Sequence, residues 1–298
     1  SWLYSRCTLP RLNDVMAKYA FDSVNVLMIE HPRLSGLVDI VRHKLLVYRA
    51  TDLYSQMHRR TWIDELEERL VVRADAVIGT SEPVLAKLRK ICPSKPQLLM
   101  ENGVELERFQ VRQPEPVEYR HIPLPRAIYV GAIDARLDID ALIRLALALP
   151  ELHIIIVGPV TEGFAGHLQR APANIHWLGP KNYSQVPSYL HYCQVGLLPF
   201  SQHPANEGRS PMKLYEYAAA GLPIVAKETL ELKRRALEFV WLYRDAAELV
   251  SCVKTALEQR NAVASVAKKY ARTQDWKAKA QELETFLSEM LQMRVKVE

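Results

Sequence analysis

Short apolar runs alternate with helix-length segments along the chain, and this alternation constrains the fold more than any other feature. Continuous apolar runs of strand length lie at 24–29, 44–50, 75–81, 126–133, 152–159 and 195–200. Segment 61–74 (TWIDELEERLVVRA) instead spaces its apolar residues on one face of a helix. Such runs predict parallel strands buried on both faces, with helices covering them. Because the pattern occurs twice, we expect an α/β fold of two Rossmann-like doubly wound domains facing a cleft.

The boundary between these domains is expected in a proline-rich stretch. Segment 112–126 (RQPEPVEYRHIPLPR) holds four prolines and shows no periodicity, as is typical of a linker. We therefore predict a first domain over 1–115, a linker over 116–125, a second domain over 126–275 and a C-terminal helix over 276–298.

Charge and cysteine usage narrow the class of partner. The 298 residues carry a net charge of +5. This charge is compatible with an anionic ligand but is lower than is typical of a protein that binds nucleic acid. The four cysteines lie far apart, as in free thiols of a reducing cytosol, so we expect a cytoplasmic protein without a nucleic-acid partner. Segment 85–95 (LAKLRKICPSK) predicts a basic amphipathic helix. This helix would either make peripheral contact with the inner face of an anionic membrane or form a solvated surface of the protein.

One helix has an unusual first turn. In SPMKLYEYAAAGLPIVA (210–226), Ser210 suits the N-cap, Pro211 the first helical position, and Gly221 the end of the helix. Lys213 then lies where the helix dipole disfavours a cation and where an anion would bind well. An exposed ion pair between Lys213 and Glu216, one turn apart, is the alternative explanation.

Three segments precede segment 210–226 in the chain: IYVGAIDARLD (128–138), LHIIIVGP (152–159) and NIHWLGPKNYSQVPSYLHYCQVGLLPF (174–200). Taken in this order, the four segments resemble the nucleotide-binding domain of GT-B glycosyltransferases of the family-4-like kind, and segment 210–226 is the most specific of them. ADAVIGTSEPVLAKL (74–88) and MENGVELERF (100–109) resemble the end of the acceptor domain. Relatives begin with more strands than this chain shows before residue 24, so we expect the first domain to lack its start.

The resemblance implies roles at the strongest motif. Lys213 would contact the donor diphosphate, alongside the helix N-terminus formed by Ser210, Pro211 and Met212. Glu216 would accept hydrogen bonds from the ribose hydroxyls.

Two loops would complete this donor site. Arg136 resembles the basic residue that reaches the phosphates, and Gly131 would permit close approach of the backbone to the donor. Many relatives carry a further glutamate eight positions before Glu216, but Gly208 stands there in this chain. Either the neighbouring Glu207 takes its place or Asn206 and backbone groups do.

The resemblance extends to two candidates in the first half. His31, in EHPRLSG (30–36), would contact the transferred sugar, although it could be an ordinary loop histidine. Asp52, in YRATDLYS (48–55), stands where an inverting enzyme places its general base. Capping of the following helix is the alternative for Asp52.

Together these features predict a metal-independent glycosyltransferase. It would move a sugar from a nucleotide-diphosphate sugar to a glycan or lipid-linked acceptor, without a cofactor or bound metal. Positive groups at the helix start would neutralise the leaving diphosphate. A nucleotide-sugar 2-epimerase of the same fold and a non-catalytic nucleotide-sugar-binding module are the alternatives.

Overall fold

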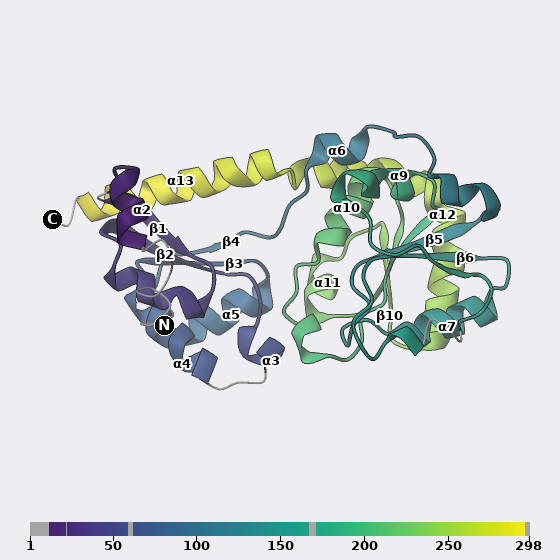
Figure 1. Ribbon diagram of the computed structural model, residues 1–298, viewed down its shortest axis with the longest axis horizontal. Coiled ribbons are helices and arrows are strands. Elements are labelled where there is room, and N and C mark those ends of the chain that lie inside the picture. Colours follow the sequence, from purple (N-terminus) through teal and green to yellow (C-terminus); the bar gives the residue numbers. More distant parts are fainter. Residues whose placement is uncertain (1–11, 22, 59–61, 167–170, 296–298) are drawn as a thin grey trace. The chain divides into compact units, whose positions relative to one another are not determined.

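The computed structural model describes residues 12–21, 23–58, 62–166 and 171–295 (Figure 1). It divides into two compact units. The first unit comprises Ser1–Glu101, Gly208–Ser210 and Lys279–Glu298, and the second comprises Asn102–Glu207 and Pro211–Ala278. The division therefore falls at Glu101, before the proline-rich stretch.

The first unit is built on a parallel sheet with strand order β1-β2-β3-β4. Its strands are β1 (Val24–Ile29), β2 (His43–Ala50), β3 (Ala76–Gly79) and β4 (Gln97–Leu99). Its helices are α2 (Leu12–Lys18), the 3-10 helix η1 (Pro32–Asp39), α3 (Tyr54–His58), α4 (Trp62–Arg73) and α5 (Glu82–Ile91). The predicted strands at 24–29, 44–50 and 75–81 are thus confirmed.

Two apolar clusters cover the two faces of this sheet. Leu46 and Tyr48 of β2 pack with buried residues of α4 and α5. Alternate residues Leu45 and Val47 face the other cluster, which includes Met290 of the long helix α13 (Trp276–Val295). This alternation follows the period of two in a strand. The last helix of the chain therefore completes the core of the first unit.

The second unit is built on a six-stranded sheet with order β10-β9-β8-β5-β6-β7, in which every strand pair is parallel. Its strands are β5 (Arg126–Val130), β6 (His153–Val157), β7 (Ile175–Trp177), β8 (Val195–Leu198), β9 (Ile224–Lys227) and β10 (Val240–Tyr243). Its helices are α6 (Leu106–Gln110), η2 (Val117–His121), α7 (Ile139–Ala148), η3 (Tyr183–Gln185), α9 (Val186–His191), η4 (Pro204–Asn206), α10 (Met212–Ala220), α11 (Leu230–Arg235) and α12 (Ala246–Thr273). The predicted α/β class with parallel sheets is confirmed, and the strand order of the second sheet is doubly wound.

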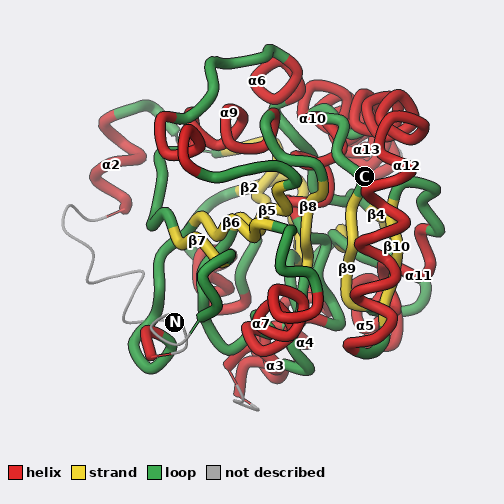
Figure 2. The backbone as a smooth tube through the Cα atoms, turned by 90° about the vertical axis from the view of Figure 1, so that its right-hand side faces the viewer, coloured by secondary structure: helices red, strands yellow, loops and turns green. Residues whose placement is uncertain are grey.

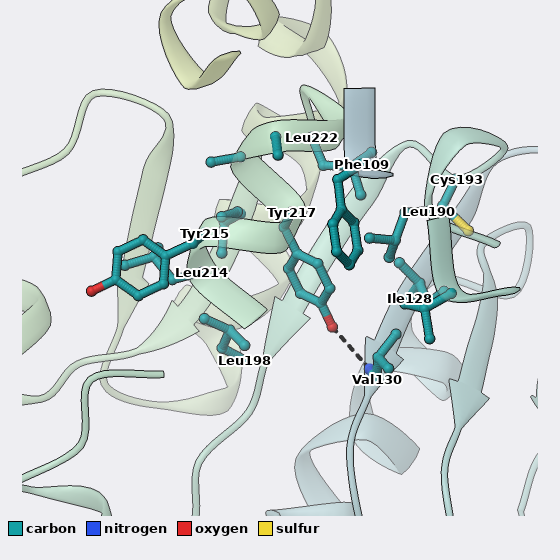
Figure 3. Packing of buried hydrophobic residues seen from close by; sticks show 14 of the residues in the cluster. Phe109, Ile128, Val130, Leu190, Cys193, Leu198, Leu214, Tyr215, Tyr217 and Leu222 are labelled. Atoms are coloured by element: carbon teal, nitrogen blue, oxygen red, sulfur yellow. Dashed lines mark hydrogen bonds between the residues drawn. The ribbon is translucent and has the colours of Figure 1, made fainter. Parts of the chain in front are cut away.

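Helices cover both faces of the second sheet. Figure 2 shows α9 and α10 on one side of it and α7 on the other. On the α10 side, Tyr217 is fully buried and its hydroxyl accepts a hydrogen bond from the Val130 N–H at 2.8 Å (Figure 3). This bond ties α10 to the carboxyl end of β5, next to the loop that carries Gly131.

The proline-rich stretch is part of the second unit rather than a free linker. Its 3-10 helix η2 buries Tyr119, which is 1% exposed and donates to the Tyr189 carbonyl at 3.1 Å. The guanidinium of Arg126 donates to the carbonyls of Tyr119 and Ile122 at 2.6–2.9 Å. Prolines indicate a lack of regular structure, but they do not show whether a segment packs.

Replacing Tyr119 tests this packing. Tyr119→Ala removes a buried aromatic ring, so we expect the second unit to lose about 3–5 kcal/mol of unfolding free energy. Val117→Ala in the same 3-10 helix is the matched control, because Val117 is 63% exposed and should change stability by no more than about 0.5 kcal/mol. Denaturant unfolding measures both variants. Equal stabilities would mean that the segment behaves as a linker.

Candidate functional site

The order of the strands in the second sheet reverses direction between β5 and β8. Strands β5 and β8 are neighbours, while the chain runs outward from β5 to β6 and, in the other direction, from β8 to β9. In open α/β sheets ligands bind outside the carboxyl ends of the strands at such a point. The loops that leave β5 and β8 there contain Gly131, Arg136 and Asn206.

Hydrogen bonds hold these two loops together. The Arg136 carbonyl accepts from the Ser201 N–H at 2.9 Å and from Asn206 Nδ2 at 3.0 Å. Asn206 Nδ2 also donates to the Ser201 carbonyl at 2.9 Å. Asn206 is 2% exposed, and its Oδ1 has no hydrogen-bond partner among the described residues. A buried acceptor without a partner is rare in native proteins and calls for an explanation.

Helix α10 begins one residue later than the sequence suggests. Pro211 is the N-cap, with extended backbone (φ −72°, ψ 117°), and no side chain caps the helix. The prediction that Ser210 is the N-cap is therefore wrong, because the helical backbone starts only at Met212. Ser210 is buried and groups with the first unit, whereas Met212 is 44% exposed. Gly221 ends the helix in the left-handed conformation (φ 79°), as predicted.

The pair of Lys213 and Glu216 is the centre of the candidate site. Lys213 Nζ donates to Glu216 Oε2 at 2.6 Å. The Lys213 side chain is 27% exposed, but that of Glu216 is only 1% exposed. The pair is thus a half-buried interaction rather than the exposed one considered above. Glu216 Oε1 is fully buried without a hydrogen-bond partner in the described part of the chain.

Burial dominates the ionisation of Glu216. Desolvation raises the pKa of this carboxyl above its ordinary value, and the nearby Lys213 ammonium only partly opposes the shift. A buried acceptor atom that is left without a partner costs about 1–3 kcal/mol, and more when its group is charged. The site therefore retains an acceptor at a thermodynamic cost.

Tyr183 and Arg108 also belong to this site, although no sequence motif points to them. The Lys213 ammonium lies 5.9 Å from the centre of the Tyr183 ring, and the Arg108 guanidinium lies 5.1 Å from it. Arg108 also donates from Nε to Glu105 at 2.6 Å. Desolvation, followed by the charge of Glu216, raises the pKa of Tyr183 well above its usual value. Tyr183 is 37% exposed, so its ring offers an aromatic surface beside Lys213.

The other predicted donor residues differ in their surroundings. Arg136 forms a salt bridge with Asp134, with 2.5 Å between Nη2 and Oδ2. A Cβ placed on Gly131 would lie 2.6 Å from the Tyr129 hydroxyl oxygen, so this glycine makes room for a neighbouring side chain. Glu207 is exposed at the end of η4.

His31 and Asp52 lie in the first unit, after β1 and β2. His31 is the N-cap of η1, and its Nδ1 accepts from the Arg33 N–H at 3.1 Å. That bond requires any proton of the neutral ring to be on Nε2. The Tyr54 ring centre lies 4.5 Å from that of His31, and the Tyr54 hydroxyl contacts Thr51 next to Asp52. Tyr54 thus lies beside both candidates.

Three further features bear on the partners of the protein. Among the described residues no group of three or more His, Cys, Asp or Glu side chains is arranged to hold a metal ion. Of the basic residues in 85–95, Lys87 and Arg89 are paired with carboxylates of the same unit, which weakens the case for an anionic-membrane surface. No helix in the described ranges is both long and apolar enough to cross a bilayer.

In sequence, this chain is similar to proteins described as glycosyltransferases. A sequence-family profile described as "Glycosyl transferase-like" matches residues 139–285. A putative teichuronic acid biosynthesis glycosyltransferase of Bacillus subtilis is 28% identical over 240 residues. That match covers 76% of this chain and 59% of the relative, so the chain spans less than two thirds of the relative's length.

Solved structures show the same fold. Sucrose-phosphate synthase from Thermosynechococcus elongatus matches with a TM-score of 0.77 at 16% identity, over 96% of this chain and 77% of its own. HepE of Anabaena, solved with UDP and glucose, matches with a TM-score of 0.72 at 17% identity, over 93% of this chain and 80% of its own. The resemblance to GT-B glycosyltransferases expected from the motifs is confirmed.

The pH dependence of stability tests the account of Glu216. Because the native pKa is raised, wild-type stability falls as pH rises through the unfolded and then the native pKa. Glu216→Gln removes this loss, so relative to wild type the variant should gain about 1 kcal/mol between pH 4 and pH 7. Unfolding curves at the two pH values measure the difference.

Glu248→Gln is the matched control with the opposite sign. Hydrogen bonds from Arg244 lower the pKa of Glu248, so this variant should lose stability relative to wild type over the same pH range. If the difference in unfolding free energy between Glu216→Gln and wild type does not change with pH, the pKa of Glu216 is not raised in the folded protein.

Proposed function

We propose that this protein is a glycosyltransferase that binds a nucleotide-diphosphate sugar in its second unit and transfers the sugar to a glycan or lipid-linked acceptor. The observation that carries the proposal is the Glu216 carboxylate. One of its oxygens is held by Lys213, and the other is buried with no partner in the described structure. A ligand hydroxyl would supply the missing donor, and the two neighbouring hydroxyls of a ribose suit a carboxylate acceptor.

Positive charge beside Glu216 supports a diphosphate as the next group of the ligand. Lys213 is partly exposed in the first turn of α10, where the helix dipole also attracts an anion. Arg136 would add a second cation once a phosphate competes with Asp134 for its guanidinium. These groups would stabilise the leaving diphosphate as its charge develops, which makes the reaction independent of a metal ion in our proposal.

Two more groups extend the proposed donor site. The Tyr183 ring offers a surface on which a nucleobase can stack. The unpartnered Oδ1 of Asn206 would accept a hydrogen bond from the donor, in preference to the exposed Glu207. Since HepE was solved with UDP, UDP is the first nucleotide to test, and the teichuronic acid relative favours a cell-envelope polysaccharide as acceptor.

Calorimetric titration of UDP, GDP and ADP without divalent metal tests the donor site. We expect one nucleotide to bind, and Lys213→Ala to weaken it by about 1.5–3 kcal/mol, the range for a hydrogen bond to a charged group. Glu216→Gln should reduce the affinity for the nucleotide more than it reduces the affinity for the 2′-deoxy analogue, because the analogue lacks one hydroxyl that Glu216 would bind.

Lys254→Ala is the matched control, since Lys254 is exposed on α12 and should leave binding unchanged. If Lys213→Ala binds as wild type does, Lys213 is only the partner of Glu216 and the donor site is misassigned.

Product analysis tests the reaction. With an acceptor present, wild type should release the nucleotide and extend the acceptor, whereas His31→Ala or Asp52→Asn should bind the donor normally but lose at least about 100-fold in turnover. An altered free nucleotide sugar without an acceptor would indicate the epimerase instead. Binding without any release of nucleotide would indicate a non-catalytic module.

A further inference from the structure

Two histidines face each other on the second sheet, in the two strands at its β7 edge. His153 begins β6, and His176 lies in the middle of β7. The register pairs Ile155 with His176. Because side chains alternate along a strand, His153 projects to the same face as Ile155 and therefore as His176. The parallel pairing thus places both imidazoles on one face.

The distance between their nitrogens suits a shared ligand. His153 Nδ1 lies 3.0 Å from His176 Nε2, and the ring centres are 5.2 Å apart. Zinc–nitrogen bonds of about 2.0–2.1 Å place two nitrogens about 2.9 Å apart at a right angle and about 3.4 Å apart at the tetrahedral angle. The measured separation lies between these values, but the ring centres are almost as far apart as in two rings that point directly at each other. Each ring would therefore have to turn about its side-chain torsions before both lone pairs could reach one ion.

Burial favours the neutral form of both rings, but the positive charge of Arg126 near His153 would also oppose a bound cation. Burial lowers the pKa of His153, and the nearby Arg126 guanidinium adds to that effect. Burial also lowers the pKa of His176, with a further contribution from His153. The neutral form of imidazole is the one that binds metals. The hydrogen bond between them places one N–H in the gap, and a change of tautomer moves that proton to the outer nitrogen of the same ring.

We propose that His153 and His176 form a two-ligand site for a divalent transition-metal ion such as Cu²⁺, Ni²⁺ or Zn²⁺. Both side chains are only partly buried, so water can occupy the remaining coordination positions. Imidazole suits these ions, whereas Mg²⁺ prefers oxygen ligands. The ion would crosslink β6 to the edge strand β7 and would take no part in the proposed donor site.

Titration of tag-free protein with Cu²⁺ at pH 7.5 tests the site. We expect one equivalent to bind with a dissociation constant on the order of micromolar, and the electron paramagnetic resonance spectrum to show two nitrogen ligands. His153→Asn and His176→Asn should each weaken binding by roughly ten-fold or more. Addition of Mg²⁺ should leave the protein unchanged.

His121→Asn is the matched control, because His121 is exposed in η2 and should not alter Cu²⁺ binding. Circular dichroism and nucleotide titration show whether each variant is folded. Folded His153→Asn and His176→Asn proteins that bind Cu²⁺ as wild type does would overturn the proposal, as would a spectrum with one nitrogen ligand. Since the substitutions lie on different strands, a folding defect in one leaves the other to decide.

Discussion

The adjacency of β5 and β8 is the constraint on which the candidate site depends. From this junction the chain continues to β6 on one side and to β9 on the other. The loops that follow β5 and β8 therefore lie next to each other at the carboxyl ends of these two strands. Backbone hydrogen bonds and the Asn206 amide then fix one loop against the other. The Tyr217 hydroxyl adds a bond from α10 to the end of β5. Helix α10 is therefore tied to the sheet through Tyr217, while no side chain caps its first turn.

Within this frame, the site keeps polar atoms that a core optimised for stability would not keep. Glu216 and Asn206 are both almost completely buried, and each has an oxygen without a partner among the described residues. The surrounding helices and strands bury enough apolar surface to tolerate this cost.

Most strands could be predicted from sequence because they are continuous apolar runs, as in HIIIV of β6. Gly221 likewise predicted the end of α10, since few other residues adopt its left-handed conformation. Strand β10 was not predicted, although its sequence VWLY is apolar, because periodicity alone does not distinguish so short an apolar run from part of a helix.

The role of Tyr183 was not predictable from its local pattern. Tyr183 was identified as part of the site only because Arg108 and Lys213, from helices distant in sequence, lie close to its ring. The spacing of Lys213 and Glu216 predicted that they could pair. It did not predict that Glu216 alone is buried, because this depends on packing around α10. Local patterns thus indicated the elements, while the surroundings of each polar group required the tertiary structure.

The packing of α13 has a consequence for the order in which the protein can fold during synthesis. Met290 is part of the same apolar cluster as Leu45 and Val47, and Arg294 pairs with Asp75 across 219 residues of sequence. The first unit therefore contains both early and late parts of the chain. On the ribosome, the second unit can complete its core while one face of the first sheet is still uncovered. Domains usually fold in the order in which they are made, but here the unit that is begun first is finished last.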